Sequence, residues 1–303
     1  MIPNLDRVLT ELSTVLEPLD LELFAQICGS GVTDGIPWIK LLNGDMLFGY
    51  SRYQDTYYKD RFDRHRAAFE SVGLTPATFG AAFDAVVSYT YENCDFPRVA
   101  RKSNFIPKGG VVLDVGVRAG HFLVKASRLA GPEGRVIGID ASDLAERYCR
   151  LHKEANRCDN VEFVRAVVGA SDGETVRFFH GSPGESMSGF YRETIGLEGR
   201  PVVSASHHSG SIETTTRTLD SLALELGLKR CDLVILQING AEVAAVRGMT
   251  RILNDLRPTL FVTCFQRPPG GEEPAAAVLG WVEDIGYEKV FHQNTDMVLR
   301  PLD

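Results

Sequence analysis

The sequence predicts an open α/β sheet whose strands are mostly parallel, and two observations carry this prediction. From about residue 106 onward, apolar strand-like runs alternate with amphipathic helical segments, the pattern of strand–helix–strand units. Only three residues separate the last two runs, at 286–292 and 296–300, which is too short for a crossover, so they must pair antiparallel. We expect this domain over residues 106–303, preceded by a smaller, mainly helical N-terminal region over residues 1–105.

The N-terminal region contains signals for helices and for one strand pair. A helical spacing of apolar residues is interrupted at Pro18, and Asn43-Gly44 is a typical hairpin turn. Thr75 and Pro76 suit the N-cap and the first position of a helix. The expected elements are helices over residues 5–27, 61–71 and 75–88, and a strand pair over residues 38–50.

Strands and helices then alternate to the end of the chain. We expect strands at residues 110–115, 135–140, 161–167, 231–238, 258–265, 286–292 and 296–300. Helices are expected near residues 119–130, 142–157, 218–227, 240–255 and 273–285. Residues 181–211 are rich in Gly, Ser and His without a clear period, and a loop of this length in a compact domain is usually functional or mobile.

A glycine-containing turn after the first of these strands carries the clearest functional signal. Asp114 lies near the strand end, and Gly116 and Gly120 follow before an amphipathic helix begins. Glycine lets a backbone approach a ligand closely, and the N–H groups at a helix start favour an anion. The spacing D-x-G-x-x-x-G is neither the dinucleotide fingerprint nor a Walker loop. A structural turn explains this motif, taken alone, equally well.

A second acidic residue, Asp140, ends the next strand. It lies about 20 residues after Gly120, the distance at which an acid at a strand tip meets a ribose diol. Alternatively, Asp140 caps the following helix together with Ser142, and the two interpretations are compatible. The two acid-tipped strands together favour a nucleoside-type ligand.

Composition excludes several classes of protein. The net charge of −8 and the pI of about 5.5 provide no basic surface for a phosphate backbone, so we expect no nucleic-acid partner. No apolar run approaches the roughly 20 residues that cross a bilayer, which predicts a cytoplasmic protein without membrane contact. The six cysteines contain no C-x-x-C pair and are expected to be reduced thiols.

Six motifs follow one another between about Tyr91 and Arg300. They are Tyr91-Glu92, Asp114-Val115-Gly116 with Gly120, the segment from Asn160 to Gly173, Thr216-Arg217-Thr218-Leu219-Asp220, Ile238-Asn239-Gly240-Ala241-Glu242 and Arg257-Pro258. Their order and spacing, over roughly two-thirds of the chain, resemble those of the FkbM-type methyltransferases, which depend on S-adenosylmethionine (SAM).

The resemblance implies a Rossmann-like sheet with an antiparallel last strand and transfer of a methyl group from SAM. The acceptor of such enzymes is usually a hydroxyl oxygen on a small molecule or sugar. The resemblance also implies cofactor contacts, in three groups. These are the methionine end of SAM near Glu92, Asp114, Gly116 and Gly120, its ribose near Asp140, and its adenine near Ala166 and Val167.

The chain departs from the family pattern after the fourth strand. Family members usually carry a pattern like K-I-D-V-E-G-A-E, whereas this chain has Ile235, Gln237 and Asn239 in place of the lysine and two acids. A hard divalent cation prefers carboxylate oxygens, so we expect no metal site. An amide takes up no proton at neutral pH, which excludes a base at 237 or 239. Arg118 replaces a usual asparagine and either contacts the SAM carboxylate or an acidic acceptor, or is a solvated loop residue.

Three residues are candidates for the catalytic role: His207 and His208 in the long loop, and Glu242 after the fourth strand. His121, at the start of the first helix of the domain, is a further candidate base. Each has a simpler alternative, because an isolated histidine is more often a hydrogen-bonded structural residue. Likewise, Glu242 suits the first turn of a helix as a stabilising acid.

The leading hypothesis is a metal-independent O-methyltransferase for a small-molecule acceptor. In it, the N-terminal region and the 181–211 loop form the acceptor pocket. The alternative is a non-catalytic SAM-binding protein on a methyltransferase fold, because acids of the family motif are missing. Methyl transfer can run on positioning alone, which favours the enzyme. The sequence leaves open the identity of the acceptor and whether the chain forms a homo-oligomer.

Overall fold

The fold is that of a computed structural model, which describes most of the chain. The described residues are 10, 13, 18–50, 56–92, 100–181, 190, 193–195, 201–203 and 208–302. Backbone contacts divide the chain into two compact units. The first comprises Met1–Asn93, Ala119–Lys125 and Arg147–Cys158, and the second comprises Cys94–Arg118, Ala126–Glu146 and Asp159–Asp303. Two helices, α6 (His121–Ala130) and α7 (Asp143–Asn156), contribute residues to both units.

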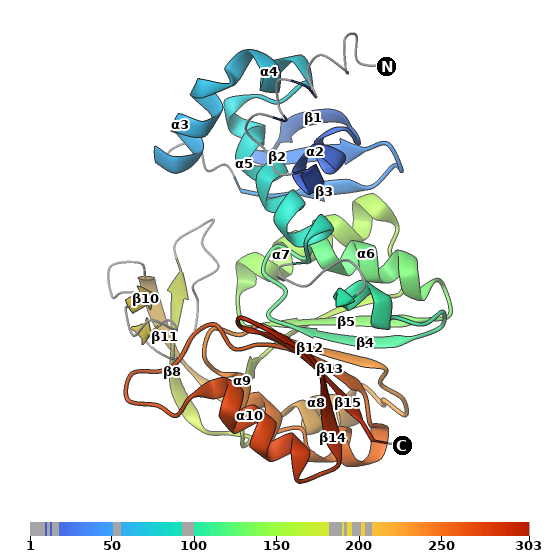
Figure 1. Ribbon diagram of the computed structural model, residues 1–303, viewed down its shortest axis with the longest axis vertical. Coiled ribbons are helices and arrows are strands. Elements are labelled where there is room, and N and C mark those ends of the chain that lie inside the picture. Colours follow the sequence, from blue (N-terminus) through green and yellow to red (C-terminus); the bar gives the residue numbers. More distant parts are fainter. Residues whose placement is uncertain are drawn as a thin grey trace. The chain divides into compact units, whose positions relative to one another are not determined.

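The second unit is built on a seven-stranded sheet, in which β4 lies between β12 and β5 (Figure 1). In spatial order its strands are β14 (Tyr287–Gln293), β15 (Asp296–Pro301), β13 (Thr259–Thr263), β12 (Leu233–Leu236), β4 (Val111–Val115), β5 (Arg135–Asp140) and β6 (Val161–Arg165). The strands from β13 to β6 pair parallel, and β15 pairs antiparallel with β13 and with β14. The predicted α/β sheet with an antiparallel last strand is confirmed.

Helices cover one face of this sheet because alternate strand residues are apolar on that side. The helices are α8 (Leu219–Glu225), α9 (Glu242–Arg247), the π-helical turn η5 (Ile252–Leu256) and α10 (Pro274–Glu283). One buried cluster joins them to the strands and includes Leu113, Ile137, Leu236 and Val262. Within the described part of the chain, no helix is long and apolar enough to cross a membrane.

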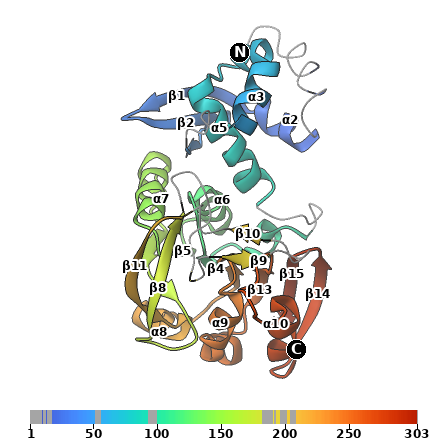
Figure 2. The same cartoon turned by 90° about the vertical axis from the view of Figure 1, so that its left-hand side faces the viewer.

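A second, smaller sheet was not expected from the sequence. It contains β7 (Val167–Val168), β11 (His208–Arg217) and β8 (Thr175–Gly181), and Figure 2 shows β8 and β11 side by side. A short pair, β9 (Thr194–Ile195) and β10 (Pro201–Val203), lies between them in sequence. The expected loop over residues 181–211 is therefore partly strand, because β11 begins at His208.

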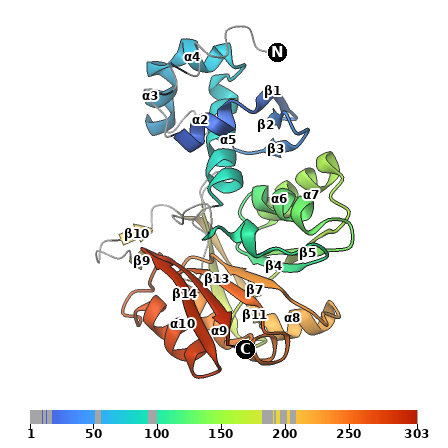
Figure 3. The same cartoon turned by 45° about the vertical axis from the view of Figure 1, so that its right-hand side comes forward.

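The first unit combines helices with a three-stranded antiparallel sheet (Figure 3). Its strands are β1 (Ile27–Thr33), β2 (Ile36–Leu41) and β3 (Met46–Phe48). The helices are α2 (Pro18–Phe24), α3 (Thr56–Arg64), α4 (Arg66–Ser71), α5 (Pro76–Ala85) and the π-helical turn η1 (Val86–Thr90). The predicted turn at Asn43-Gly44 is present between β2 and β3, whereas β1 was not predicted. Its signal was Asp34-Gly35, where both residues have the positive φ of a tight hairpin turn.

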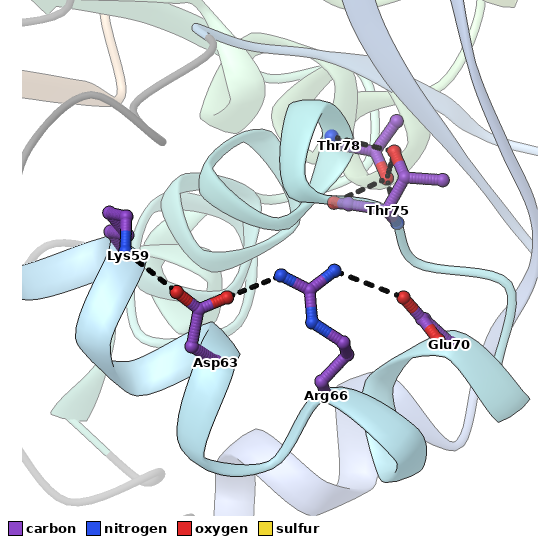
Figure 4. A network of polar contacts seen from close by, with 6 residues as sticks. All are labelled: Lys59, Asp63, Arg66, Glu70, Thr75 and Thr78. Carbon is purple, nitrogen blue, oxygen red and sulfur yellow. Dashed lines mark hydrogen bonds and ion pairs between the residues drawn. The ribbon is translucent and has the colours of Figure 1, made fainter.

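The helices of the first unit are fixed by a capping box and by surface ion pairs, which Figure 4 shows. Thr75 is the N-cap of α5, as predicted, and its side chain accepts from the Thr78 N–H. The structure adds a reciprocal bond, in which the Thr75 N–H donates to the Thr78 hydroxyl. Asp63 and Arg66 join α3 to α4 by an ion pair of 2.5 Å. Exposed pairs of this kind contribute at most about 1 kcal/mol each, so the buried and mutually packed rings of Phe62, Phe69 and Phe79 carry more of this unit's stability.

Two buried histidines hold the backbone of β3. The backbone N–H of Phe48 donates to His152 Nε2 at 2.8 Å, and His121 Nε2 lies 2.7 Å from the Phe48 carbonyl oxygen. Each side chain is 1% exposed. Because His152 accepts a hydrogen bond through Nε2, its neutral form is the one that fits. Burial and the neighbouring His121 hold the pKa of His152 well below 6.5.

We expect the first unit to lose stability as the pH falls below 6.5. In this range the unfolded chain binds a proton at His152 that the folded chain excludes, so the free energy of unfolding falls by up to about 1.4 kcal/mol per pH unit. Urea titrations between pH 5 and 7.5, followed by Trp38 fluorescence in a Trp281→Phe background, measure this slope. His152→Gln keeps an acceptor for Phe48 and should flatten it. An unchanged slope would contradict the assignment.

Candidate functional site

The glycine turn lies at the carboxyl end of β4, as predicted. Gly116 has φ of 91°, and its N–H donates to the Ile139 carbonyl at 2.8 Å, which joins the turn to β5. Asp114, two residues earlier, is 5% exposed. Burial raises the pKa of Asp114 to about 6, while the Lys102 ammonium opposes this shift and Asp140 adds to it.

Asp140 is held at the tip of β5 by backbone donors. Ser142 N–H donates to Oδ1 at 3.0 Å, and Arg118 N–H donates to Oδ2 at 3.2 Å. Burial raises the pKa of Asp140 to about 6, and these hydrogen bonds partly offset the shift. Both interpretations of Asp140 therefore remain compatible. The carboxylate starts the next loop, and its roughly four lone-pair sites exceed the three backbone N–H groups, of Ser142, Arg118 and Ala141, that it accepts from.

The segment after β6 lies beside Asp140. The Ala166 N–H donates to the Asp140 carbonyl at 3.0 Å, and Asp140 is paired with Arg165 in the parallel register of β5 and β6. Val167 is buried and begins β7. The structure therefore brings Ala166 and Val167 to the same edge of the sheet as Asp140, which is the arrangement that the adenine assignment requires.

The end of β12 packs directly against the glycine turn. Gln237 N–H donates to the Val115 carbonyl at 3.0 Å. A Cβ at Gly116 would lie 2.0 Å from the Gln237 carbonyl oxygen, so only glycine fits there. This junction between β4 and β12 is the point where strand order reverses, and open α/β sheets bind ligands at such points.

Glu242 is enclosed by the loop that it follows. Its carboxylate is 1% exposed and accepts from Ile238 N–H at 2.9 Å and from Gly240 N–H at 3.0 Å. Burial raises the pKa of Glu242 to about 7, and these backbone donors lower it. The geometry gives Glu242 a positioning role in the β12–α9 loop. Its predicted catalytic role stays a prediction.

Glu92 and Gly120 belong to the first unit. Glu92 is fully buried and accepts from Lys125 Nζ at 2.6 Å, and the same ammonium donates to the Tyr89 carbonyl at 3.0 Å. Gly120 has φ of 75° directly before α6, and a Cβ there would lie 2.8 Å from Cys149 Sγ. Glu92 is thus ion-paired with Lys125, a contact that the sequence does not predict.

Three non-glycine residues in the candidate segments have left-handed backbone. Glu92, Arg118 and Asn239 have φ of 61°, 56° and 54°. Such residues cost about 1–3 kcal/mol each and cluster where function constrains the backbone. At Arg118 this conformation directs the backbone N–H toward the Asp140 carboxylate. The residue that replaces the family's usual asparagine therefore helps to orient Asp140 through its backbone.

The predicted bases have different outcomes. His207 lies outside the described residues, and His208 begins β11, with its side chain also outside them. His121 holds the Phe48 carbonyl from a buried position, which supports its structural alternative. Among the residues that the structure describes, no group of three or more His, Cys, Asp or Glu side chains could hold a metal ion.

Three polar residues near the turn were missed by the sequence analysis: Lys102, Thr263 and Asp296. Lys102 lies in the 3-10 turn η3 (Lys102–Phe105), is 2% exposed, and donates to Gln237 Oε1 at 2.5 Å. Gln237 Nε2 in turn contacts Thr263 at 2.8 Å, and Thr263 contacts Asp296 at 2.6 Å. Nothing in the segment Arg101-Lys102-Ser103 marks this lysine as a site residue.

A family model supports the motif assignment. The model described as the methyltransferase FkbM domain matches residues 114–289, which is more than half of the chain. No curated protein matches the sequence.

Among solved structures, one similar chain is the methyltransferase FkbM from Methylobacillus flagellatus KT, at 12% identity and a TM-score of 0.43. That match covers 81% of this chain and 60% of the other. A SAM-dependent methyltransferase from Aquifex aeolicus has 14% identity and a TM-score of 0.36, covering 66% and 86%. The Aeropyrum pernix fibrillarin, in complex with SAM, has 11% identity and a TM-score of 0.40, covering 90% and 98%.

Proposed function

Because the chain belongs to the FkbM family of SAM-dependent methyltransferases, we propose that it methylates a hydroxyl oxygen of a small molecule or sugar without a metal ion. SAM is the cofactor that this family uses. The observation that carries the proposal is the pair of acid-bearing strand ends at Asp114 and Asp140, which flank a glycine turn at the carboxyl edge of the sheet.

The residues present fit the nucleoside part of SAM. Asp140 is fixed by backbone N–H groups, so its orientation costs little entropy when a diol binds. A carboxylate can accept from both ribose hydroxyls. Ala166 and Val167 offer an apolar surface beside it, which suits an uncharged purine. Glu92, Gly116 and Gly120 complete the proposed cofactor contacts.

When bound, SAM supplies an electrophilic methyl group on a sulfonium centre. The chain must then hold the oxygen of the acceptor hydroxyl in line with that carbon, and a base must remove the hydroxyl proton. His207 and His208 are the proposed bases, because neutral imidazole accepts a proton near pH 7. Glu242 has a raised pKa in the same range, and we propose that it mainly holds the loop after β12.

The test is transfer of radiolabelled methyl from SAM to a metabolite extract and to a panel of hydroxylated compounds. Label in a small molecule supports the proposal, and loss of transfer in the His207→Ala/His208→Ala double variant supports the base. Full activity in that variant would discard the base alone. Tight SAM binding without transfer to any acceptor would favour the non-catalytic alternative.

Methyl transfer is expected to be insensitive to metal chelation. Gln237 and Asn239 present amides where the family motif carries acids, and hard divalent cations prefer carboxylate oxygens. We expect the rate in 5 mM EDTA, about a hundredfold over trace metal, to stay within about twofold of the untreated rate. A loss of activity that magnesium restores would show that a metal site exists.

A further inference from the structure

A row of polar side chains crosses three strands at the carboxyl edge of the sheet. Thr263 and Asp296 are register partners on β13 and β15. Gln237 directly follows β12, whose last residue Leu236 is the register partner of Val262, so Gln237 lies beside Thr263 on the neighbouring strand β13. Because strand residues alternate between faces, Gln237, Thr263 and Asp296 lie on the same face of the sheet.

The donors and acceptors of this row allow only one direction. A lysine ammonium has donors and no acceptor, so Gln237 turns its Oε1 toward Lys102. Gln237 Nε2 must then donate to Thr263 Oγ1. The Thr263 hydroxyl, having accepted, donates to Asp296 Oδ1. The direction of each hydrogen bond is thus determined by the one before it, from the Lys102 ammonium to the Asp296 carboxylate.

The two ends of the row are buried opposite charges. Lys102 and Asp296 are each 2% exposed, and the Lys102 ammonium also lies 5.0 Å from the centre of the Phe261 ring. Burying either charge without compensation is expensive. An amide and a hydroxyl between the two charges complete a hydrogen-bonded path, which a carboxylate at 237 could not, because it has no N–H to donate to Thr263.

Within this row, Gln237 lies against the glycine turn. Leu236 is the register partner of Val115, so Gln237 occupies the position next to Gly116. Its backbone carbonyl would collide with any side chain there, at 2.0 Å from a Cβ. Fixing both ends of the Gln237 side chain therefore fixes the residue on which the turn rests.

We propose that Lys102, Gln237, Thr263 and Asp296 form a positioning relay, in which two buried opposite charges, linked by hydrogen bonds through an amide and a hydroxyl, hold the Gly116 turn in its SAM-binding position. This inference rests on the proposed function for its link to SAM. None of the four residues is assigned contact with the reacting atoms. Where the family motif has an acid, Gln237 therefore loses a carboxylate but provides an N–H group that can donate to Thr263.

The sharpest test compares Thr263→Val with Thr263→Ser. Valine has nearly the shape of threonine without the hydroxyl, whereas serine keeps the hydroxyl. We expect Thr263→Val to weaken SAM binding by about tenfold, the effect of one lost hydrogen bond in a buried network, and Thr263→Ser to recover most of it. Calorimetry measures the affinity. If both variants bind SAM as tightly as the parent chain, the proposal is overturned. A lower melting temperature of Thr263→Val alone would mean that the row stabilises the fold without affecting SAM binding.

A double-mutant cycle tests coupling between the ends. Lys102→Met and Asp296→Asn should each raise the dissociation constant for SAM about tenfold, because each removes one of the hydrogen bonds that orient the row. The double variant should lose markedly less than the product of the two effects. The matched control is Lys108→Met with Asp284→Asn, which are exposed positions in the same unit.

The cycle also separates this inference from the proposed function. If the parent chain binds no SAM, the proposed function fails, and the same cycle in urea still measures coupling between Lys102 and Asp296 in the free energy of unfolding. Additive effects in both binding and unfolding would overturn the relay. Coupling in unfolding without any effect on SAM affinity would overturn its positioning role.

Discussion

Asp140→Ala is expected to weaken SAM binding by at least about 100-fold. Two hydroxyl donors to one carboxylate contribute about 1.5 kcal/mol or more each, and 1.4 kcal/mol corresponds to a factor of ten. The structure adds a second cost, because Arg118 N–H and Ser142 N–H lose their acceptor and the loop relaxes.

Calorimetry with SAM and S-adenosylhomocysteine measures this effect. Asp143→Ala is the matched control, since Asp143 is an exposed acid three residues later, and we expect its affinity within about twofold of the parent chain. Asp140→Asn should be intermediate, because an amide keeps one acceptor. An affinity unchanged in Asp140→Ala, with the fold intact, would remove Asp140 from the cofactor site.

Gly116→Ala is expected to disrupt the second unit. Its Cβ would lie 2.0 Å from the Gln237 carbonyl oxygen, and the φ of 91° is unfavourable for any L side chain. The φ alone costs about 1–2 kcal/mol, whereas the backbone collision forces β4 and β12 apart. We expect a total loss of about 4 kcal/mol or more, with loss of SAM binding.

Gly173→Ala separates these two causes. Gly173 has φ of 77°, and nothing lies within 4 Å of a Cβ built there, so this variant carries the φ cost without the collision. Chemical denaturation followed by circular dichroism should give about 1–2 kcal/mol for Gly173→Ala. If the two variants lose the same stability, the close approach of Gly116 to β12 is not what the fold depends on.

The sheet of the second unit could be predicted because its strands are short apolar runs between clear turns. The strands ending near Asp114 and Asp140 were both identified, and the short connection Gln293-Asn294-Thr295 was enough to predict the antiparallel last strand. In each case local sequence and tertiary burial favour the same structure. These are also the strands that carry the nucleoside motif.

The smaller sheets could not be found by the same reasoning. Strand β11 has an exposed, threonine-rich face, and its partner β8 is separated from it by the Gly- and Ser-rich segment, so neither shows a strong apolar period. Strand β1 contains two glycines and is mostly half-exposed. Long-range pairing, rather than local preference, determines these strands.

The polar row illustrates a different limit. Gln237 was correctly recognised as a departure from the family motif, but the sequence gives no sign that Lys102, 135 residues earlier, reaches it. A lysine in a polar segment is usually solvated. Only the structure shows that this one is buried, and therefore that the amide at 237 has a partner on each side.

The buried ionisable groups make mild acid act on the two units in opposite directions. Asp114 and Asp140 have folded pKa values near 6, above their usual 3.8, so their contribution to stability is largest below pH 3.8 and is lost as the pH rises through 6. His152 in the first unit has the opposite shift and loses its contribution below pH 6.5. Acidification therefore stabilises the second unit relative to the first, and between pH 7.5 and pH 5 we expect the urea midpoint of the first unit to fall relative to that of the second.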